Sequence, residues 1–261
     1  MYIDYDVADR IATITLNRPE AANAQNPELL DELDAAWTRA AADSEVSVIV
    51  LRANGKHFSA GHDLKGGGPV PDKITLEFII EHEAKRYLEY TLRGRNVPKP
   101  SIAAVQGRCI SGGLLLCWPC DLIVAADDAQ FSDPVVLMGI GGVEYHGHTW
   151  ELGPRKAKEI LFTGRAMTAD EVLSTGMVNR VVPRDRLDTE TRALAEQIAT
   201  MPPFALRQAK RAVNQTLDVQ GFYAAIQSVF DVHQTGHGNA LSVGGWPVLV
   251  DLEQMKAANT S

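Results

Sequence analysis

The segment Gln106-Gly107-Arg108-Cys109-Ile110-Ser111-Gly112-Gly113-Leu114 carries more information about this 261-residue chain than any other. It opens an apolar run that is typical of a helix, so the free N–H groups of the first turn would face the preceding loop. A second segment, Phe58-Ser59-Ala60-Gly61-His62-Asp63-Leu64-Lys65, also offers small residues where backbone N–H groups can approach a ligand closely. Two such donors aimed at one point form an oxyanion hole, which stabilises negative charge on a carbonyl oxygen.

Further blocks in the same order make a specific resemblance. From Ile11 to about Ala212 the chain resembles the crotonase (enoyl-CoA hydratase/isomerase) superfamily, which binds acyl-CoA thioesters in such a hole. Besides the two segments above, the resemblance rests on Asn17-Arg18-Pro19 with Asn23-Ala24, Val48–Arg52, Lys99–Val105, Cys120–Ala125, Leu161–Arg165 and Gly176–Val182. It implies an α/β fold with a spiral of β-β-α units and a C-terminal helical subdomain.

Hydrophobic periodicity indicates the same class of fold. Strands are predicted over Val7–Leu16, Val46–Arg52 and Ser101–Val105, and helices over Pro27–Asp43 and Ile74–Arg93. Strands that alternate with helices indicate a layered α/β domain. From Arg186 onward the pattern is helical only, over Leu187–Thr200, Pro203–Thr216 and Val219–Gly236. We therefore predict an α/β core over residues 1–185 and a C-terminal helical oligomerisation region over residues 186–261.

Composition narrows the classes of partner. The chain has 25 Lys and Arg against 33 Asp and Glu, a net charge of −8, which argues against nucleic acid but leaves an anionic ligand possible. Its start, Met1–Asp6, is acidic and has no apolar signal-peptide region. No apolar stretch is long enough to span a bilayer. The sequence thus predicts a soluble cytoplasmic protein with neither a nucleic-acid nor a membrane partner.

Two patterns could be mistaken for redox or metal sites. Cys117-Trp118-Pro119-Cys120 fits C-x-x-C, but it follows an apolar helix, where the thiols should be buried and inert. His146-x-His148 offers only two metal ligands, and Cys109 does not complete a zinc site with the other cysteines. We therefore expect no metal, and no separate cofactor either, because coenzyme A would be part of the substrate.

The resemblance assigns roles within the first two segments. It implies that the N–H groups of His62 and Gly112 form the oxyanion hole. A structural role remains open for the His62 side chain, and a solvated surface position remains open for Lys65. The coenzyme A portion would contact the first segment at Ala60, His62, Asp63, Leu64 and Lys65.

The chain departs from the family at the two carboxylates that hydratases use to activate and deliver water. By the resemblance, these positions are Leu115 and Val135, and aliphatic side chains cannot transfer protons. Glu144 is the leading candidate for a replacement acid/base group, with Tyr145 and His146 as helpers. The alternative for Glu144 is a cap or salt bridge at the surface. Asp133 is a weaker acid/base candidate.

The resemblance also implies assembly and a reaction class. Family members form trimers or hexamers, so a homotrimer or hexamer is expected. An apolar stripe could serve as the interface or as intrachain core; it comprises Phe222, Tyr223, Ile226, Val229 and Phe230. We expect an enzyme acting on acyl-CoA through an enolate, with isomerase- or hydrolase-like chemistry rather than ordinary hydration. The rival hypothesis is a non-catalytic acyl-CoA-binding homologue.

Overall fold

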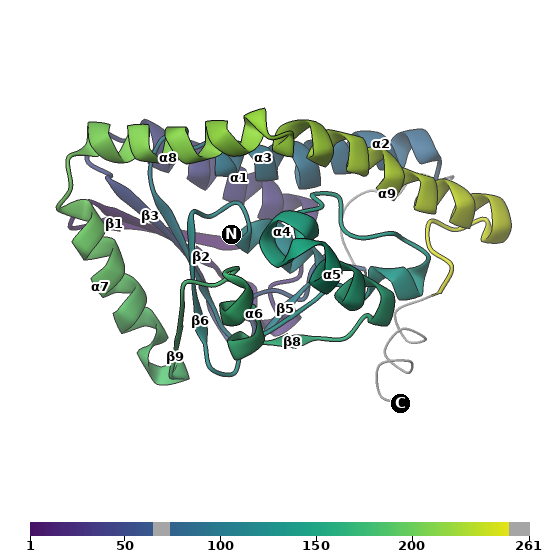
Figure 1. The fold of residues 1–261 in the computed structure, drawn as a ribbon, viewed down its shortest axis with the longest axis horizontal. Helices are drawn as coiled ribbons and strands as arrows, with labels where there is room; N and C mark the ends of the chain where they lie inside the picture. Colours follow the sequence, from purple (N-terminus) through teal and green to yellow (C-terminus); the bar gives the residue numbers. More distant parts are fainter. Residues whose placement is uncertain (65–73, 251–261) are drawn as a thin grey trace.

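A six-stranded sheet forms the centre of the computed structural model, which describes residues 1–64 and 74–250 (Figure 1). Its strand order is β1-β2-β3-β4-β6-β9, with β1 antiparallel to β2 and every other neighbouring pair parallel. A smaller sheet has the order β5-β7-β8. The strands are β1 (Ile3–Ala8), β2 (Ile11–Leu16), β3 (Val48–Ala53), β4 (Ser101–Val105), β5 (Arg108–Ile110), β6 (Leu122–Ala126), β7 (Gln130–Ser132), β8 (Met167–Thr168) and β9 (Arg180–Val182).

Both faces of the large sheet are covered, which explains the continuous apolar runs of its strands. Alternate side chains of β3 belong to two different cores: Ile49 and Leu51 lie in the core that contains helix α1 (Pro27–Ala42), and Val48 and Val50 in the core that contains α7 (Leu187–Ala199). The mixed α/β class predicted from the sequence is confirmed.

The remaining helices wrap around this frame. They are α2 (Leu76–Glu83), α3 (Tyr90–Arg95), α4 (Leu114–Cys117), α5 (His148–Thr163), α6 (Ala169–Thr175), α8 (Pro203–Val219) and α9 (Phe222–Gly244). Figure 1 shows α8 and α9 end to end along one long edge of the molecule, with α2 beside α9. Within residues 1–64 and 74–250, none of these helices has the length and apolar character needed to cross a membrane.

Three predicted elements differ from the structure for local reasons. The strand predicted over Val7–Leu16 is divided into the end of β1 and all of β2, because Asp9 and Arg10 have positive φ angles of 51° and 66° and form the two-residue turn between them. The helix predicted over Ile74–Arg93 is interrupted by a π-helical segment, Ala84–Glu89. The last helix begins after Gly221, whose φ of 101° breaks the α-helical path.

The C-terminal helices contribute to the core of the same chain. Helix α7 packs on the large sheet, and the domain boundary at residue 186 stays a prediction. Phe222, Ile226 and Phe230 of the apolar stripe are buried within the chain, so the stripe serves mainly as intrachain core. Tyr223 remains 46% exposed.

The predicted burial of the C-x-x-C pair is confirmed. Cys117 and Cys120 are both buried, and burial raises the pKa of both thiols. Since only a thiolate attacks a disulfide, these cysteines have the character of core residues rather than a redox pair.

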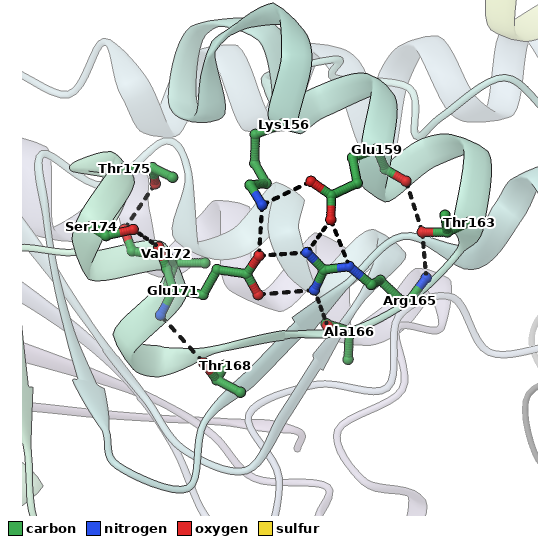
Figure 2. A network of polar contacts seen from close by, with 10 residues as sticks. All are labelled: Lys156, Glu159, Thr163, Arg165, Ala166, Thr168, Glu171, Val172, Ser174 and Thr175. Carbon is green, nitrogen blue, oxygen red and sulfur yellow. Dashed lines mark hydrogen bonds and ion pairs between the residues drawn. The ribbon is translucent and has the colours of Figure 1, made fainter.

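A cluster of ion pairs holds α5 against α6 (Figure 2). The Thr168 hydroxyl accepts a hydrogen bond from the Glu171 N–H at 3.3 Å, as expected for the N-terminal cap of α6. The Glu171 carboxylate accepts hydrogen bonds from Arg165 at 2.5 and 2.9 Å and from Lys156 at 2.9 Å. The hydrogen bond from Arg165 lowers the pKa of Glu171 to about 2, although burial opposes this.

Glu171→Gln should therefore remove a contribution to stability that depends on pH in a defined direction. A carboxylate with a lowered folded-state pKa stabilises the fold above its unfolded pKa near 4.5, and this stability is lost as pH falls toward 2. Because the cluster is partly exposed, we expect the free energy of unfolding at pH 7 to fall by about 1 kcal/mol. Urea unfolding from pH 7 to 2 measures the difference, which should disappear at the acid end.

Glu190→Gln is the matched control, since Glu190 makes a single surface ion pair with Arg186 four residues earlier. That pair should contribute only about 0.3–0.5 kcal/mol. A deficit in Glu171→Gln that stays constant down to pH 2 would contradict the assignment.

Candidate active site

Backbone hydrogen bonds join the two small-residue segments along their length. Ser59 N–H donates to the Arg108 carbonyl at 3.2 Å, and Ile110 N–H donates to the Ser59 carbonyl at 3.0 Å. A Cβ on Gly61 would lie 2.6 Å from the Ile110 carbonyl oxygen and 3.2 Å from the Gly112 nitrogen. With its φ of +84°, position 61 therefore accommodates only glycine.

The same contact brings the two predicted oxyanion donors together. Gly61 carbonyl accepts from Gln25 N–H at 2.8 Å, and Asp63 N–H donates to the Gln25 carbonyl at 3.0 Å. This pairing passes over the intervening His62 N–H, for which residues 1–64 and 74–250 provide no acceptor in the observed hydrogen bonds. Because His62 is bonded to Gly61, covalent geometry limits its nitrogen to roughly 7 Å from the Gly112 nitrogen.

The side chain of Asn23 holds the backbone that leads into the Phe58–Lys65 segment. Its side chain is fully buried, and its amide donates to the carbonyls of Asn54 at 2.9 Å and His57 at 3.0 Å. Its side-chain oxygen accepts from Arg18 N–H at 2.9 Å. These hydrogen bonds connect the loop after β3 to the Asn17-Arg18-Pro19 turn. The turn therefore supports the first small-residue segment of the site.

The imidazole of His62 lies against Gly112. A Cβ on Gly112 would lie 2.5 Å from Cδ2 of His62 and 2.9 Å from Oε1 of Gln25. On its other side, the imidazole stacks on Tyr87 with 3.8 Å between ring centroids. The His62 side chain is therefore part of the site as well as its backbone N–H.

Glu144 is brought to this imidazole. Its carboxyl is fully buried, with Oε1 at 3.5 Å from Nε2 of His62, so the alternative of a surface cap or salt bridge is wrong. Neither carboxyl oxygen has a hydrogen-bond partner among the described residues. Burial raises the pKa of Glu144, as is typical of an acid/base group that must hold a proton.

Asp133 holds the segment that presents Glu144. Its carboxylate accepts from Val143 N–H at 3.1 Å and lies 2.9 Å from Nε2 of His148. Burial opposes ionisation of Asp133, but the interaction with His148 outweighs it and holds the pKa below its usual range. Asp133 is thus an ionised anchor, and the geometry favours a positioning role for it over proton transfer.

The two predicted helpers point elsewhere. The Tyr145 ring packs against Phe222, with 6.1 Å between centroids, and lines a separate cavity of about 450 Å³. The His146 ring lies 4.5 Å from that of His148, and burial lowers its pKa to about 4. Neither side chain has an observed interaction with Glu144 in the described part of the chain.

His233, which sequence analysis missed, lies closer to Glu144 than the two predicted helpers do. Nε2 of His233, on α9, is 4.0 Å from Oε1 of Glu144. The sequence gives no direct signal for this contact, since 89 residues separate the two positions. The only available pattern was the spacing of His233 and His237, which places both on one face of a helix.

The predicted coenzyme A contacts vary in exposure. Ala60 and His62 are half-buried, and Leu64 is 53% exposed. Asp63 is paired with Arg18 at 2.6 Å, which fixes the end of the loop. The prediction for Lys65 falls outside the described residues.

The aliphatic replacements are also placed by the structure. Leu115 is buried and lines a small cavity of about 20 Å³ together with Gln25 and Tyr87, two neighbours of the His62 ring. Val135 is half-buried. Leu115 therefore presents a hydrocarbon surface close to the site.

Comparisons with known proteins identify the family of this chain. The sequence model of the enoyl-CoA hydratase/isomerase family matches residues 6–237. A protein described as a putative enoyl-CoA hydratase, EchA13 of Mycobacterium tuberculosis, is 44% identical to this chain over 284 residues. The match covers 98% of this chain and 89% of that protein.

Solved structures give the same result. The crystal structure of a probable enoyl-CoA hydratase from Mycobacterium smegmatis is 86% identical, with a TM-score of 0.94, over 96% of this chain and 100% of the other. That of a probable enoyl-CoA hydratase from Mycobacterium thermoresistibile is 88% identical, with a TM-score of 0.93, over 95% of this chain and 99% of the other.

Substitution by alanine should have different effects on stability at Gly112 and at Gly113. A Cβ on Gly113 would lie 2.9 Å from the Ser59 carbonyl oxygen, a backbone atom that cannot move aside. We expect Gly113→Ala to lower the free energy of unfolding by about 2 kcal/mol through overpacking. Gly112→Ala meets only side chains, so it should cost less than about 1 kcal/mol but displace the His62 ring.

Urea unfolding and the imidazole NMR signals of His62 measure these two effects. The His62→Ala background serves as the control, because removing the ring removes its clash with Gly112→Ala. Equal destabilisation by the two alanines, or an unmoved His62 signal in Gly112→Ala, would contradict the described packing.

Proposed function

Because this chain belongs to the enoyl-CoA hydratase/isomerase family, we propose that it is an enzyme that acts on acyl-CoA thioesters through an enolate. The thioester oxygen binds between the N–H groups of His62 and Gly112. Donors fixed in this way stabilise negative charge as it develops on the oxygen and are typically worth about 3–4 kcal/mol each in the transition state. Polarising the thioester makes the proton on its α-carbon acidic.

Glu144 then acts as the acid/base group. The observation that carries this assignment is the position of its buried carboxyl, 3.5 Å from the imidazole that lies against Gly112. As a base it takes the α-proton, and as an acid it returns the proton at a different carbon or at the same one. The nearby imidazole of His62 offers a group that can orient the carboxyl between these steps.

The reaction class follows from the number of acid/base groups. Hydration across a double bond uses one group to activate water and another to deliver a proton, and Leu115 and Val135 supply neither. Moving a proton along an enolate requires only one such group. We therefore favour isomerisation, or hydrolase-like chemistry, over hydration.

The same aliphatic residues support a second candidate. A homologue that has lost both usual carboxylates could bind acyl-CoA without turning it over. In that case Glu144 would be a buried structural acid and the oxyanion hole would serve binding only. Proton exchange at the α-carbon separates the two functions, because a binder does not catalyse it.

Glu144→Gln should abolish exchange of thioester α-protons with deuterated water. A single acid/base group typically supplies about 10²–10⁴ in rate, so we expect a loss of that size with acyl-CoA binding retained. Mass spectrometry of a saturated acyl-CoA incubated with the protein in deuterium oxide measures exchange, and calorimetry measures binding.

Glu151→Gln is the matched control, since Glu151 is a half-buried acid seven residues further along the chain, on α5, and lines the separate cavity. It should leave exchange unchanged. Absence of exchange in the unmodified protein, with binding intact, would favour the non-catalytic binder. Fast hydration of crotonyl-CoA that Glu144→Gln leaves unaffected would show that Glu144 is not the acid/base group.

We further propose that the chain assembles as a homotrimer or hexamer. Helix α8 is amphipathic but has no fully buried residue in the single chain. Its exposed apolar side chains include Phe204, Val213 and Val219, which are 65%, 62% and 88% exposed. A second copy of the chain would remove this apolar surface from water.

Sedimentation at micromolar concentration should therefore show a trimer or a hexamer. The double variant Phe204→Glu/Val213→Glu should shift it to smaller species, because burying two charges at an interface is costly. Phe162→Glu is the control: Phe162 is 77% exposed on α5 and should tolerate the charge. A monomeric unmodified chain would overturn the proposal.

A further inference from the structure

A second cluster of buried polar side chains adjoins Glu144. Glu83 lies at the end of α2, and His233 and His237 lie one turn apart on α9. All three are nearly inaccessible, with exposures of 9%, 5% and 7%. Their ligand-type atoms gather within 4.8 Å of one another. Such burial of charge-bearing groups calls for a compensating partner.

The spacing of the donor atoms matches a metal site. Nε2 of His233 lies 3.1 Å from Nε2 of His237 and 3.2 Å from Oε2 of Glu83, and Nε2 of His237 lies 3.3 Å from Oε1 of Glu83. Ligands held about 2.0–2.1 Å from a tetrahedral ion are separated by roughly 3.3–3.4 Å. These separations, two of them to different oxygens of Glu83, are close to those between the ligands of such an ion.

The other ring nitrogens fix the tautomers. Nδ1 of His233 lies 2.6 Å from the Gly142 carbonyl oxygen, and Nδ1 of His237 lies 2.8 Å from that of Pro247. Since a carbonyl only accepts, each Nδ1 carries a proton, which leaves each Nε2 as the ring atom that faces the other members of the cluster. Metal-binding histidines are held in this way in most proteins.

The two Nε2 atoms lie 3.1 Å apart, so they repel unless a proton or a cation lies between them. The Glu83 carboxylate is beside both rings, so a metal ion in this place would contact all three side chains.

We propose that Glu83, His233 and His237 bind a divalent first-row transition-metal ion of the zinc type. Two imidazoles and one carboxylate suit borderline ions such as Zn²⁺, while Mg²⁺ and Ca²⁺ prefer oxygen ligands only. Glu144 adjoins the three ligands, with its Oε1 4.0 Å from Nε2 of His233. The proposal departs from the sequence-based expectation of no metal, and the ligands differ from the His146-x-His148 pair considered there.

Calorimetric titration of the chelator-treated full-length protein with Zn²⁺ tests the site. We expect one ion per chain, with release of protons that is detected by repeating the titration in buffers of different ionisation enthalpy. Glu83→Gln and His237→Asn should each weaken binding by more than about 100-fold, since each removes a direct ligand. Circular dichroism and the thermal midpoint check that both variants remain folded.

The matched control is His82→Asn, which removes an imidazole next to Glu83 in the sequence but outside the cluster. It should bind Zn²⁺ as the unmodified protein does. The proposal is overturned if the unmodified protein fails to bind Zn²⁺, if both ligand variants bind it unchanged, or if Mg²⁺ binds as tightly as Zn²⁺. Because every readout is metal binding, the result is independent of whether Glu144 acts in catalysis.

Discussion

The hydrogen bonds between the backbone at Ser59 and the backbone from Arg108 to Ile110 hold the candidate site together. They bring a loop that follows β3 into contact with a loop that follows β5, so that Gly61 lies against the nitrogen of Gly112. No side chain could perform this task, because the contact distances leave no room for a Cβ at position 61. The glycine at position 61 is therefore required by the close approach of two backbone segments, and this approach also places the N–H groups of His62 and Gly112 near each other.

Around this backbone frame, the polar groups form a continuous series. His62 lies against Gly112, Glu144 lies beside His62, and His233 lies between Glu144 and Glu83. Each carboxylate in the series adjoins at least one imidazole, which is how a protein tolerates several buried ionisable groups in a small volume. A change at one member therefore alters the electrostatic environment of the next.

The sequence predicted the parts of the site that depend on local backbone chemistry. The small-residue segments identified both loops, and the missing carboxylates at Leu115 and Val135 directed attention to Glu144. The contact with His233 could not be predicted, because it depends on how α9 packs across the molecule. Local strain was equally hidden: the turn at Asp9 and Arg10 contains no glycine, and nothing in Ile74–Arg93 marks where the helix changes period. The stripe from Phe222 to Phe230 was correctly seen as apolar, but periodicity alone does not say which surface covers it.

The π-helical segment Ala84–Glu89 determines the direction in which Glu83 points. Such segments contain one residue more than the α-helix they interrupt and are frequent at functional sites. Deleting one residue here would restore a regular helix and rotate α2 by about 100° relative to α3. Glu83 would then turn away from His233, while Tyr87 could keep its place against His62. The buried position of Glu83 beside His233 therefore depends on the one additional residue in this turn of the helix.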